Sequence, residues 1–243
     1  MCARIFFAGA SGAVGRRLLP LLLARGYQVL AVSRSAERAA ALRAAGAEAQ
    51  VLDVFDAEAL RQALLAFRPQ WVIHQLTDLP PGLDPARMGA AIERNARLRR
   101  EGTANLVAAA QAAGAERLVA QSIAWAYAPG PLPHREEQPL DLHAEGARGV
   151  SVGAVAALER AVLTAPMQGM VLRYGRLYGP GTGTEQPDPR LGLHVDDAAR
   201  AALLALEWGV AGCYNLVEND CEVSAALARY RLGWQPGFRL QEG

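Results

Sequence analysis

The 243-residue chain carries 25 basic and 24 acidic side chains, for a net charge of +1, and 51% of its residues are hydrophobic. That apolar content supports a sizeable core and excludes global disorder. The charge balance argues against a nucleic-acid or membrane-surface partner. No apolar run approaches the ~20 residues of a membrane span, and the glycine-rich start argues against a secretion signal. Cys2, Cys213 and Cys221 are odd in number and lack CxxC spacing, which indicates free thiols in a reducing cytoplasm and no metal site.

Short apolar runs alternate with helical patterns along the chain. Strands are predicted over 4–8, 28–32, 49–52, 71–74, 117–120, 169–173 and 213–217. Helices are predicted over 14–25, 36–45, 57–67, 86–113, 150–163, 195–208 and 222–230. Continuous apolar strands separated by helices predict an α/β fold with a Rossmann-type, doubly wound parallel sheet. We expect a dinucleotide-binding domain over residues 1–177 and a small, reduced C-terminal substrate lobe over 178–243, interleaved with it.

A glycine motif joins the first predicted strand to the first predicted helix. Its first glycine, Gly9, permits a tight turn, and the second, Gly12, lets the backbone approach a pyrophosphate. The third, Gly15, lets helix and strand pack closely, and unpaired N–H groups at the helix start would bind the pyrophosphate. The sequence therefore predicts a dinucleotide site, with loop contacts at Gly9, Ser11, Gly12, Ala13, Val14 and Gly15.

The end of the second predicted strand indicates which dinucleotide binds. An acidic residue there would bind the ribose 2′-hydroxyl and favour NAD, but the sequence has Ser33, Arg34 and Ser35. A guanidinium with two hydroxyls suits a 2′-phosphate, because Arg presents a forked array of donors. We expect NADP(H) to be preferred, with NAD(H) as the alternative. Asp53, after the third strand, either accepts from the adenine amino group or caps the following helix.

Longer motifs cover most of the chain. They are GASGAVG at 9–15, VIHQL at 72–76, Asn95 followed by GTANL at 102–106, RLVAQS at 117–122, LRYGRLYGPG at 172–181, HVDDAAR at 194–200 and YNL at 214–216. Together they resemble the extended, epimerase/dehydratase-like branch of the short-chain dehydrogenases/reductases. The resemblance implies that Ser122 is the catalytic serine and that Asn95 contacts substrate. It extends the predicted cofactor site to Val54, Gln75, Leu76, Thr77, Arg173, Tyr174 and Gly175.

The chain departs from that family at its proton-transfer residues. The family uses a Tyr-x-x-x-Lys pair, whose ammonium lowers the phenol pKa. With Glu159 as the anchor, Ser151 takes the Tyr position and Val155 the Lys position, and all 25 basic residues of the chain are Arg. The family mechanism as usually drawn therefore does not apply. The short connection over 182–193 also argues against a nucleotide-sugar substrate.

Several residues remain as replacements for the missing pair. Tyr127 either supplies a phenol or packs as a loop aromatic, and His134 and His143 either act as acid/base groups or are solvated. Arg148 could replace the cation, although it does not titrate. Ser122 and Tyr127 are the catalytic candidates that we retain.

Two functions fit these observations. The first is an NADP(H)-binding oxidoreductase of the short-chain type, acting on a small substrate with a non-standard proton donor. The second is a non-catalytic NADP(H)-binding redox sensor or scaffold. The helices over 86–113 and 150–165 either pack in the core or, as the resemblance implies, form a homodimer.

Overall fold

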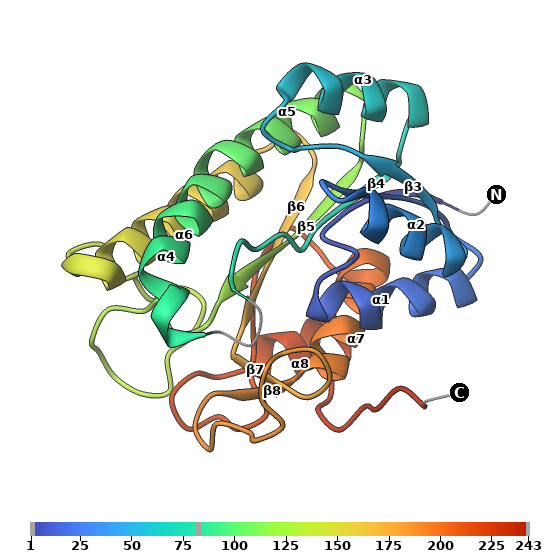
Figure 1. Cartoon of the computed structure of the whole chain (residues 1–243). Coiled ribbons are helices and arrows are strands. Elements are labelled where there is room, and N and C mark those ends of the chain that lie inside the picture. The colour runs from blue at the N-terminus through green and yellow to red at the C-terminus, as the bar shows by residue number, and fades with distance from the viewer. Residues whose placement is uncertain (1–2, 81–83, 242–243) are drawn as a thin grey trace.

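The computed structural model describes residues 3–80 and 84–241. Seven parallel strands form one sheet in the order β3-β2-β1-β4-β5-β6-β9, which confirms the predicted Rossmann-type α/β fold (Figure 1). Their bounds are β1 (Arg4–Ala8), β2 (Gln28–Ser33), β3 (Glu48–Val51), β4 (Trp71–His74), β5 (Arg117–Ile123), β6 (Gln168–Tyr174) and β9 (Gly212–Leu216). Two short strands, β7 (Arg176–Tyr178) and β8 (Gly192–His194), pair with each other outside this sheet.

Helices cover both faces of the sheet (Figure 1). They are α1 (Ala13–Ala24), α2 (Ala36–Ala44), α3 (Ala57–Phe67), α4 (Pro85–Arg97), α5 (Thr103–Ala112), α6 (Gly146–Leu163), α7 (Val195–Trp208) and α8 (Ala226–Leu232). Successive strand residues point to opposite faces, so Phe7 packs with the helices α1 and α7 while Phe6 packs with α3, α5 and α6. The apolar runs of the sequence are strands buried from both sides.

Three predicted helices differ from the observed ones. The helix expected over 150–163 begins four residues earlier, at Gly146. The helix expected over 86–113 is divided by a π-helical turn at Leu98–Gly102, which separates α4 from α5. The helix expected from residue 222 begins at Ala226 instead. Its delay has a local cause, because the side chains of Asp220 and Ser224 accept the N–H groups of Ala225 and Ala226.

The C-terminal residues are tied to the main sheet. Strand β9 is its seventh strand and α7 packs against α1, so much of 178–243 lies in the same layers as the first part of the chain. The proposed division after residue 177 stays a prediction. Cys213 and Cys221 are free thiols, and Cys2 lies outside the described residues.

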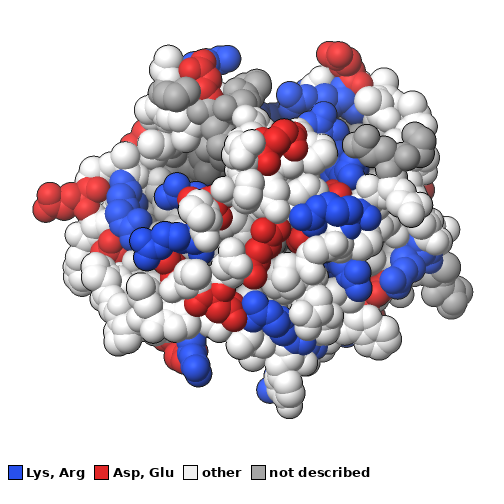
Figure 2. Space-filling view, turned by 90° about the horizontal axis from the view of Figure 1, so that it is seen from below, with Lys and Arg blue, Asp and Glu red and all other residues white. Residues whose placement is uncertain are grey.

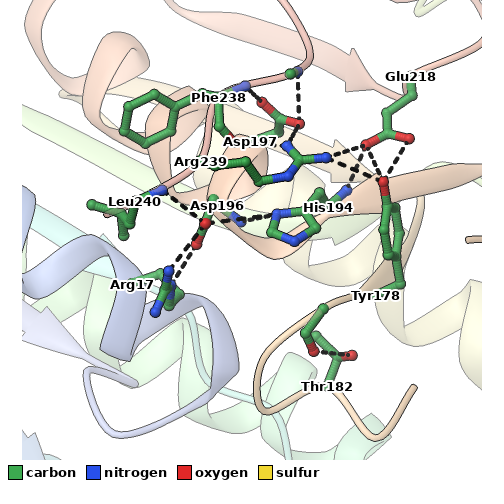
Figure 3. A network of polar contacts seen from close by, with 12 residues as sticks. Arg17, Tyr178, Thr182, His194, Asp196, Asp197, Glu218, Phe238, Arg239 and Leu240 are labelled. Carbon is green, nitrogen blue, oxygen red and sulfur yellow. Dashed lines mark hydrogen bonds and ion pairs between the residues drawn. The ribbon is translucent and has the colours of Figure 1, made fainter. Parts of the chain in front are cut away.

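Two adjacent carboxylates at the start of α7 anchor the C-terminal tail (Figure 3). Asp197, fully buried, accepts from the N–H groups of Gly237 and Phe238 at 3.0 and 2.8 Å and from the Arg239 guanidinium at 2.8 Å. Asp196 accepts from Arg17 of α1 and from the Leu240 N–H. The tail is therefore fastened across the N-terminal ends of α1 and α7.

Within the described residues, no helix combines the length and the apolar character that a membrane crossing needs. Figure 2 shows basic and acidic side chains interspersed over one face of the molecule. Helices α4 and α6 pack side by side on one face of the molecule (Figure 1). Pairing of this face with a second copy stays a prediction.

Replacing Asp197 by Ala should lower the free energy of unfolding by roughly 2–3 kcal/mol, because it removes the buried acceptor of two part-buried N–H groups and of the Arg239 guanidinium. Urea denaturation measures the loss. Glu58→Ala is the control, since its ion pair with Arg61 is exposed, and it should change stability by under about 0.5 kcal/mol. Equal effects of the two substitutions would contradict the anchoring role of Asp197.

Candidate cofactor and substrate site

Two adjoining cavities lie at the carboxyl ends of the central strands. The larger, of about 1320 Å³, and the smaller, of about 290 Å³, share the glycine loop and the segment after β4 as lining. This place is where strand order changes direction, with β2 on one side of β1 and β4 on the other. Open α/β sheets bind ligands at such a crevice.

The glycine loop has the close approaches that its sequence predicts. Gly9 has φ +99°, and a Cβ there would lie 2.5 Å from the carbonyl carbon of Gln75. A Cβ on Gly15 would lie 2.1 Å from the Gly9 carbonyl oxygen. Gly12 is the N-cap of α1, and no side chain satisfies the first N–H groups of that helix. These groups are available to an anionic pyrophosphate.

A buried polar atom without a partner in the described part of the chain lies beside this loop. Gln75 follows β4, is 4% exposed and donates its amide N–H to the Tyr174 hydroxyl at 3.2 Å. Its Oε1 is buried and has no hydrogen-bond partner among the described residues. Buried polar groups are normally paired. The tight glycine cradle, the uncapped helix start and this free acceptor all fit a dinucleotide.

The smaller cavity contains the residues predicted to select the cofactor. Ser33 Oγ accepts from the Ser35 N–H, and Ser35 Oγ accepts from the Arg38 N–H and so caps α2. The Arg34 guanidinium is more than half exposed and lies 3.6 Å from the Asp78 carboxylate. Arg38 lines both cavities and was missed in the sequence, although it follows Arg34 by about one helical turn.

The structure decides one of the two alternatives for Asp53. Its carboxylate accepts from the Phe55 N–H at 3.0 Å, while Asp56 caps α3 by accepting from the Ala59 N–H. The helix-cap interpretation of Asp53 is therefore wrong, because the chain makes a tight turn before the helix starts. Asp53 lines the smaller cavity, and its contact with adenine stays a prediction.

Ser122 forms the floor of the larger cavity, and a buried ion-pair network lies directly behind it. Ser122 is fully buried and donates to Glu159 Oε1 at 2.7 Å. Arg173 donates to both oxygens of Glu159, at 2.9 and 2.6 Å. Ser122 lines the cavity, but its single proton is held by Glu159. In this geometry Ser122 has no proton left to donate to a substrate.

Tyr127, the second catalytic candidate, lies outside the cavity lining. Its hydroxyl donates to Asn215 at 2.7 Å and accepts from Arg173 at 2.7 Å. Burial raises the pKa of Tyr127 to about 12. The sequence suggested a loop phenol near the substrate, but the loop folds back so that the ring stacks on His134 beneath β6 and β9. We therefore do not assign it a role in proton transfer.

The other candidates to replace the Tyr/Lys pair, His134, His143 and Arg148, also lie outside the described lining of the two cavities. His134 and His143 are absent from the described lining of both cavities, and His143 is exposed. Arg148 donates to Asp141 and to the carbonyls of Trp125 and Tyr127, so it holds the loop after β5. Ser151, which takes the family's Tyr position, does line the larger cavity.

Asn95 and Arg99 bring α4 and its π-helical turn to the cavity. Asn95 Oδ1 accepts from the Asp78 N–H at 2.9 Å and fixes the segment after β4. Arg99 is buried and lines the cavity, and it was not among the predicted site residues. His74 lies beneath them, where burial, aided by Arg99, lowers its pKa to about 4. His74 is therefore neutral and accepts from the Leu76 N–H.

Most predicted cofactor residues surround the two cavities. The lining contains Gly9, Ser11, Gly12, Ala13, Val14, Ser33, Arg34, Ser35, Asp53, Val54, Gln75, Leu76, Thr77, Tyr174 and Gly175. Gly15 and Arg173 lie behind this surface, where Gly15 packs against the Gly9 carbonyl and Arg173 pairs with Glu159. Direct contact of any one of them with a cofactor stays a prediction.

Replacing Gly15 by Ala should disrupt the loop, because its Cβ would overlap the Gly9 carbonyl oxygen. We expect a stability loss of about 1–3 kcal/mol and at least ~10-fold weaker NADP(H) binding, measured by fluorescence titration. Gly153→Ala on α6 is the matched control, since its Cβ would have nothing within 4 Å. That control should gain about 0.5–1 kcal/mol. Unchanged cofactor affinity in Gly15→Ala would contradict the assigned role.

Comparison with known proteins agrees with this geometry. The model of the NAD(P)H-binding family matches residues 9–188. A Streptomyces protein named 3-diazoavenalumate denitrifying reductase is 43% identical over 238 residues, covering 89% of this chain and 76% of that protein. Both matches span far more than the glycine loop.

Solved structures share the fold at low sequence identity. UDP-glucose 4-epimerase from Thermotoga maritima has a TM-score of 0.76 at 19% identity, covering 96% of this chain and 93% of the epimerase. The dTDP-glucose 4,6-dehydratase DesIV from Streptomyces venezuelae has a TM-score of 0.76 at 17% identity, covering 97% and 92%. The chain therefore belongs to the NAD(P)H-binding family and has the fold of the extended short-chain epimerases and dehydratases.

Proposed function

We propose that the chain is an NADPH-dependent reductase that acts on a small electrophile bearing a diazonium group. Two observations support it: an intact dinucleotide cradle beside a large cavity, and 43% identity to a protein whose name describes a diazo compound and the loss of its nitrogen. NADPH, when bound, supplies a hydride. The chain's own residues then have to hold the substrate and to provide any proton that the reaction needs.

The cavity lining is the observation that carries this proposal. Carbonyl reduction consumes a hydride and a proton, and a positioned acid contributes roughly 10²–10⁴-fold to such a step. Among the described lining residues there is no histidine, lysine or cysteine, and the two carboxyl groups, Asp53 and Asp188, accept hydrogen bonds from backbone N–H groups. Tyr174 is the phenol of this lining, but it is buried against Gln75 and the Ala198 carbonyl, and burial raises its pKa.

A diazonium group removes the need for a proton donor. The balance is R–N₂⁺ + H⁻ → R–H + N₂: a hydrogen–carbon bond forms, the carbon–nitrogen bond breaks, and its electron pair leaves with N₂. The substrate is reduced and NADPH is oxidised to NADP⁺, with no proton taken from the protein. Loss of the Tyr/Lys pair is then compatible with catalysis, and the expected replacement proton donor is unnecessary.

Purified protein with NADPH and an arenediazonium salt should show oxidation of NADPH, followed at 340 nm, with one N₂ released per NADPH. Aldehydes and ketones should react at least ~10²-fold more slowly, since they require the absent acid. Gly15→Ala is the control for direct reaction of the diazonium with free NADPH. Tight NADPH binding with no turnover above that control would contradict the reductase and favour a sensor or scaffold.

We also propose that NADP(H) is preferred over NAD(H). Arg34 and Arg38 both line the cavity for the adenosine end, beside the Ser33 and Ser35 hydroxyls. The Arg34 guanidinium keeps more than half of its surface exposed despite its 3.6 Å contact with Asp78, so it is free to reorient. No acidic side chain follows β2 at residues 33–36 to bind a ribose 2′-hydroxyl.

Arg34→Ala should weaken NADP⁺ binding by roughly 10-fold, the value of about one charge-assisted hydrogen bond. NAD⁺ affinity should hardly change. Quenching of intrinsic tryptophan fluorescence measures both affinities. Arg43→Ala is the control, because the Arg43 guanidinium donates to the Ala49 carbonyl and does not line the described cavities. Equal affinities of the wild type for NADP⁺ and NAD⁺ would refute the preference.

A further inference from the structure

Arg99 is a buried cation without a bonded partner. It is 7% exposed, and no hydrogen bond or ion pair holds its guanidinium among residues 3–80 and 84–241. Every other buried charged side chain of the described chain, such as Arg173, Glu159 and Asp197, has a partner at hydrogen-bond distance. Arg99 also lines the larger cavity, so its donors face that space.

The groups around Arg99 do not neutralise it. Glu159 attracts it, but that carboxylate already forms two hydrogen bonds with Arg173 and one with Ser122. His74 is neutral on the other side. Burial lowers the pKa of Arg99 to about 10, which leaves it charged at neutral pH. The floor therefore carries one unbalanced positive charge.

The backbone aims this side chain inward. Arg99 lies in the π-helical turn Leu98–Gly102, and its neighbour Arg100 in the same turn is exposed. π-Bulges inside helices are frequent at functional sites. None of the Arg99 nitrogens is among the fully enclosed polar atoms that lack a partner, so these donors face the space of the cavity. Within the described chain, the charge of Arg99 forms no hydrogen bond or ion pair that would hold the fold together.

Part of the wall of the cavity that Arg99 lines is apolar. It includes Met88 and Ile92 on α4, Leu79 after β4, Ile123 at the end of β5 and Trp125 beyond it. A ligand that fills this space has an apolar body, with Trp125 available for stacking, and one anionic end. The glycine loop before α1 would bind the pyrophosphate of a cofactor, and it lies on other elements of the fold than Arg99, which follows α4.

We propose that Arg99 binds the carboxylate of the substrate, so that the protein takes an aryl or arylalkenyl carboxylic acid with its apolar body on the Trp125 wall. This inference rests on the proposed reductase only in calling the ligand a substrate. A planar fork of N–H donors matches a carboxylate in two parallel hydrogen bonds. The substrate is then held at the end remote from the reacting group.

The test is a binding measurement that needs no turnover. Benzoate, cinnamate and 5-phenylpenta-2,4-dienoate are each titrated calorimetrically into the protein saturated with NADP⁺, alongside the corresponding amides. At least one acid should bind the wild type ~10–100-fold more tightly than its amide, as expected for a charge-assisted bidentate pair. Arg99→Met should abolish that preference, and Arg99→Lys should retain part of it.

Arg100→Met is the matched control, because it removes the same side chain from the exposed position next along the turn. It should keep the acid preference, and all variants should keep NADP⁺ affinity. Arg99→Met should unfold at the same or a higher temperature than the wild type. If none of the acids binds better than its amide, or if Arg99→Met keeps the preference, the inference is overturned.

Failure of the reductase can be told apart from failure of this site. Acid preference lost in Arg99→Met without diazo turnover would support the site and reject the reaction. Diazo turnover with equal KM for acid and amide forms would support the reaction and reject the site.

Discussion

The buried carboxylate of Glu159 organises the floor of the cavity. From α6 it accepts hydrogen bonds from Ser122 on β5 and from Arg173 on β6, and so joins one helix to two strands. Arg173 in turn reaches the Tyr127 hydroxyl and the Glu136 carbonyl, which fixes the loop between β5 and α6. Paired charges of this kind are costly to break, because one partner would remain buried alone. The floor is consequently rigid, and the hydroxyl proton of Ser122 is held in its hydrogen bond to Glu159.

The reaction that we propose takes no proton from the protein, so loss of the Tyr/Lys pair is compatible with catalysis. In a site that reduces carbonyls, the serine hydroxyl and a phenol face the substrate oxygen. Here the serine faces Glu159, and Ser151 lines the cavity where the family has its tyrosine. Such a floor suits a substrate that accepts a hydride and releases a neutral leaving group. In the reaction that we propose, the substrate supplies the electrophilic group and the protein positions it against the hydride donor.

Sequence reasoning predicted what depends on local pattern. Apolar runs defined all seven sheet strands, and the glycine spacing located the cradle, because both reflect backbone constraints on neighbouring residues. It could not predict contacts such as Ser122 with Glu159, which join residues far apart in the chain. The burial of Arg99 could not be predicted for a related reason. In the run Leu98-Arg99-Arg100-Glu101 the two arginines look alike, and only the π-helical turn and the packing of α6 against it bury one and expose the other.

Glu159 and Arg99 have different roles at this cavity: Glu159 stabilises the fold, and Arg99 is available to bind a ligand. Both oxygens of Glu159 accept hydrogen bonds from the protein itself, so Glu159 contributes to the structure independently of any ligand. Arg99 has none within hydrogen-bond distance in the described chain, so its interaction energy is available only when an anion enters. A cation that the fold already holds at the cavity loses little freedom on pairing. The fixed position of Arg99 therefore favours the binding of the carboxylate that we propose.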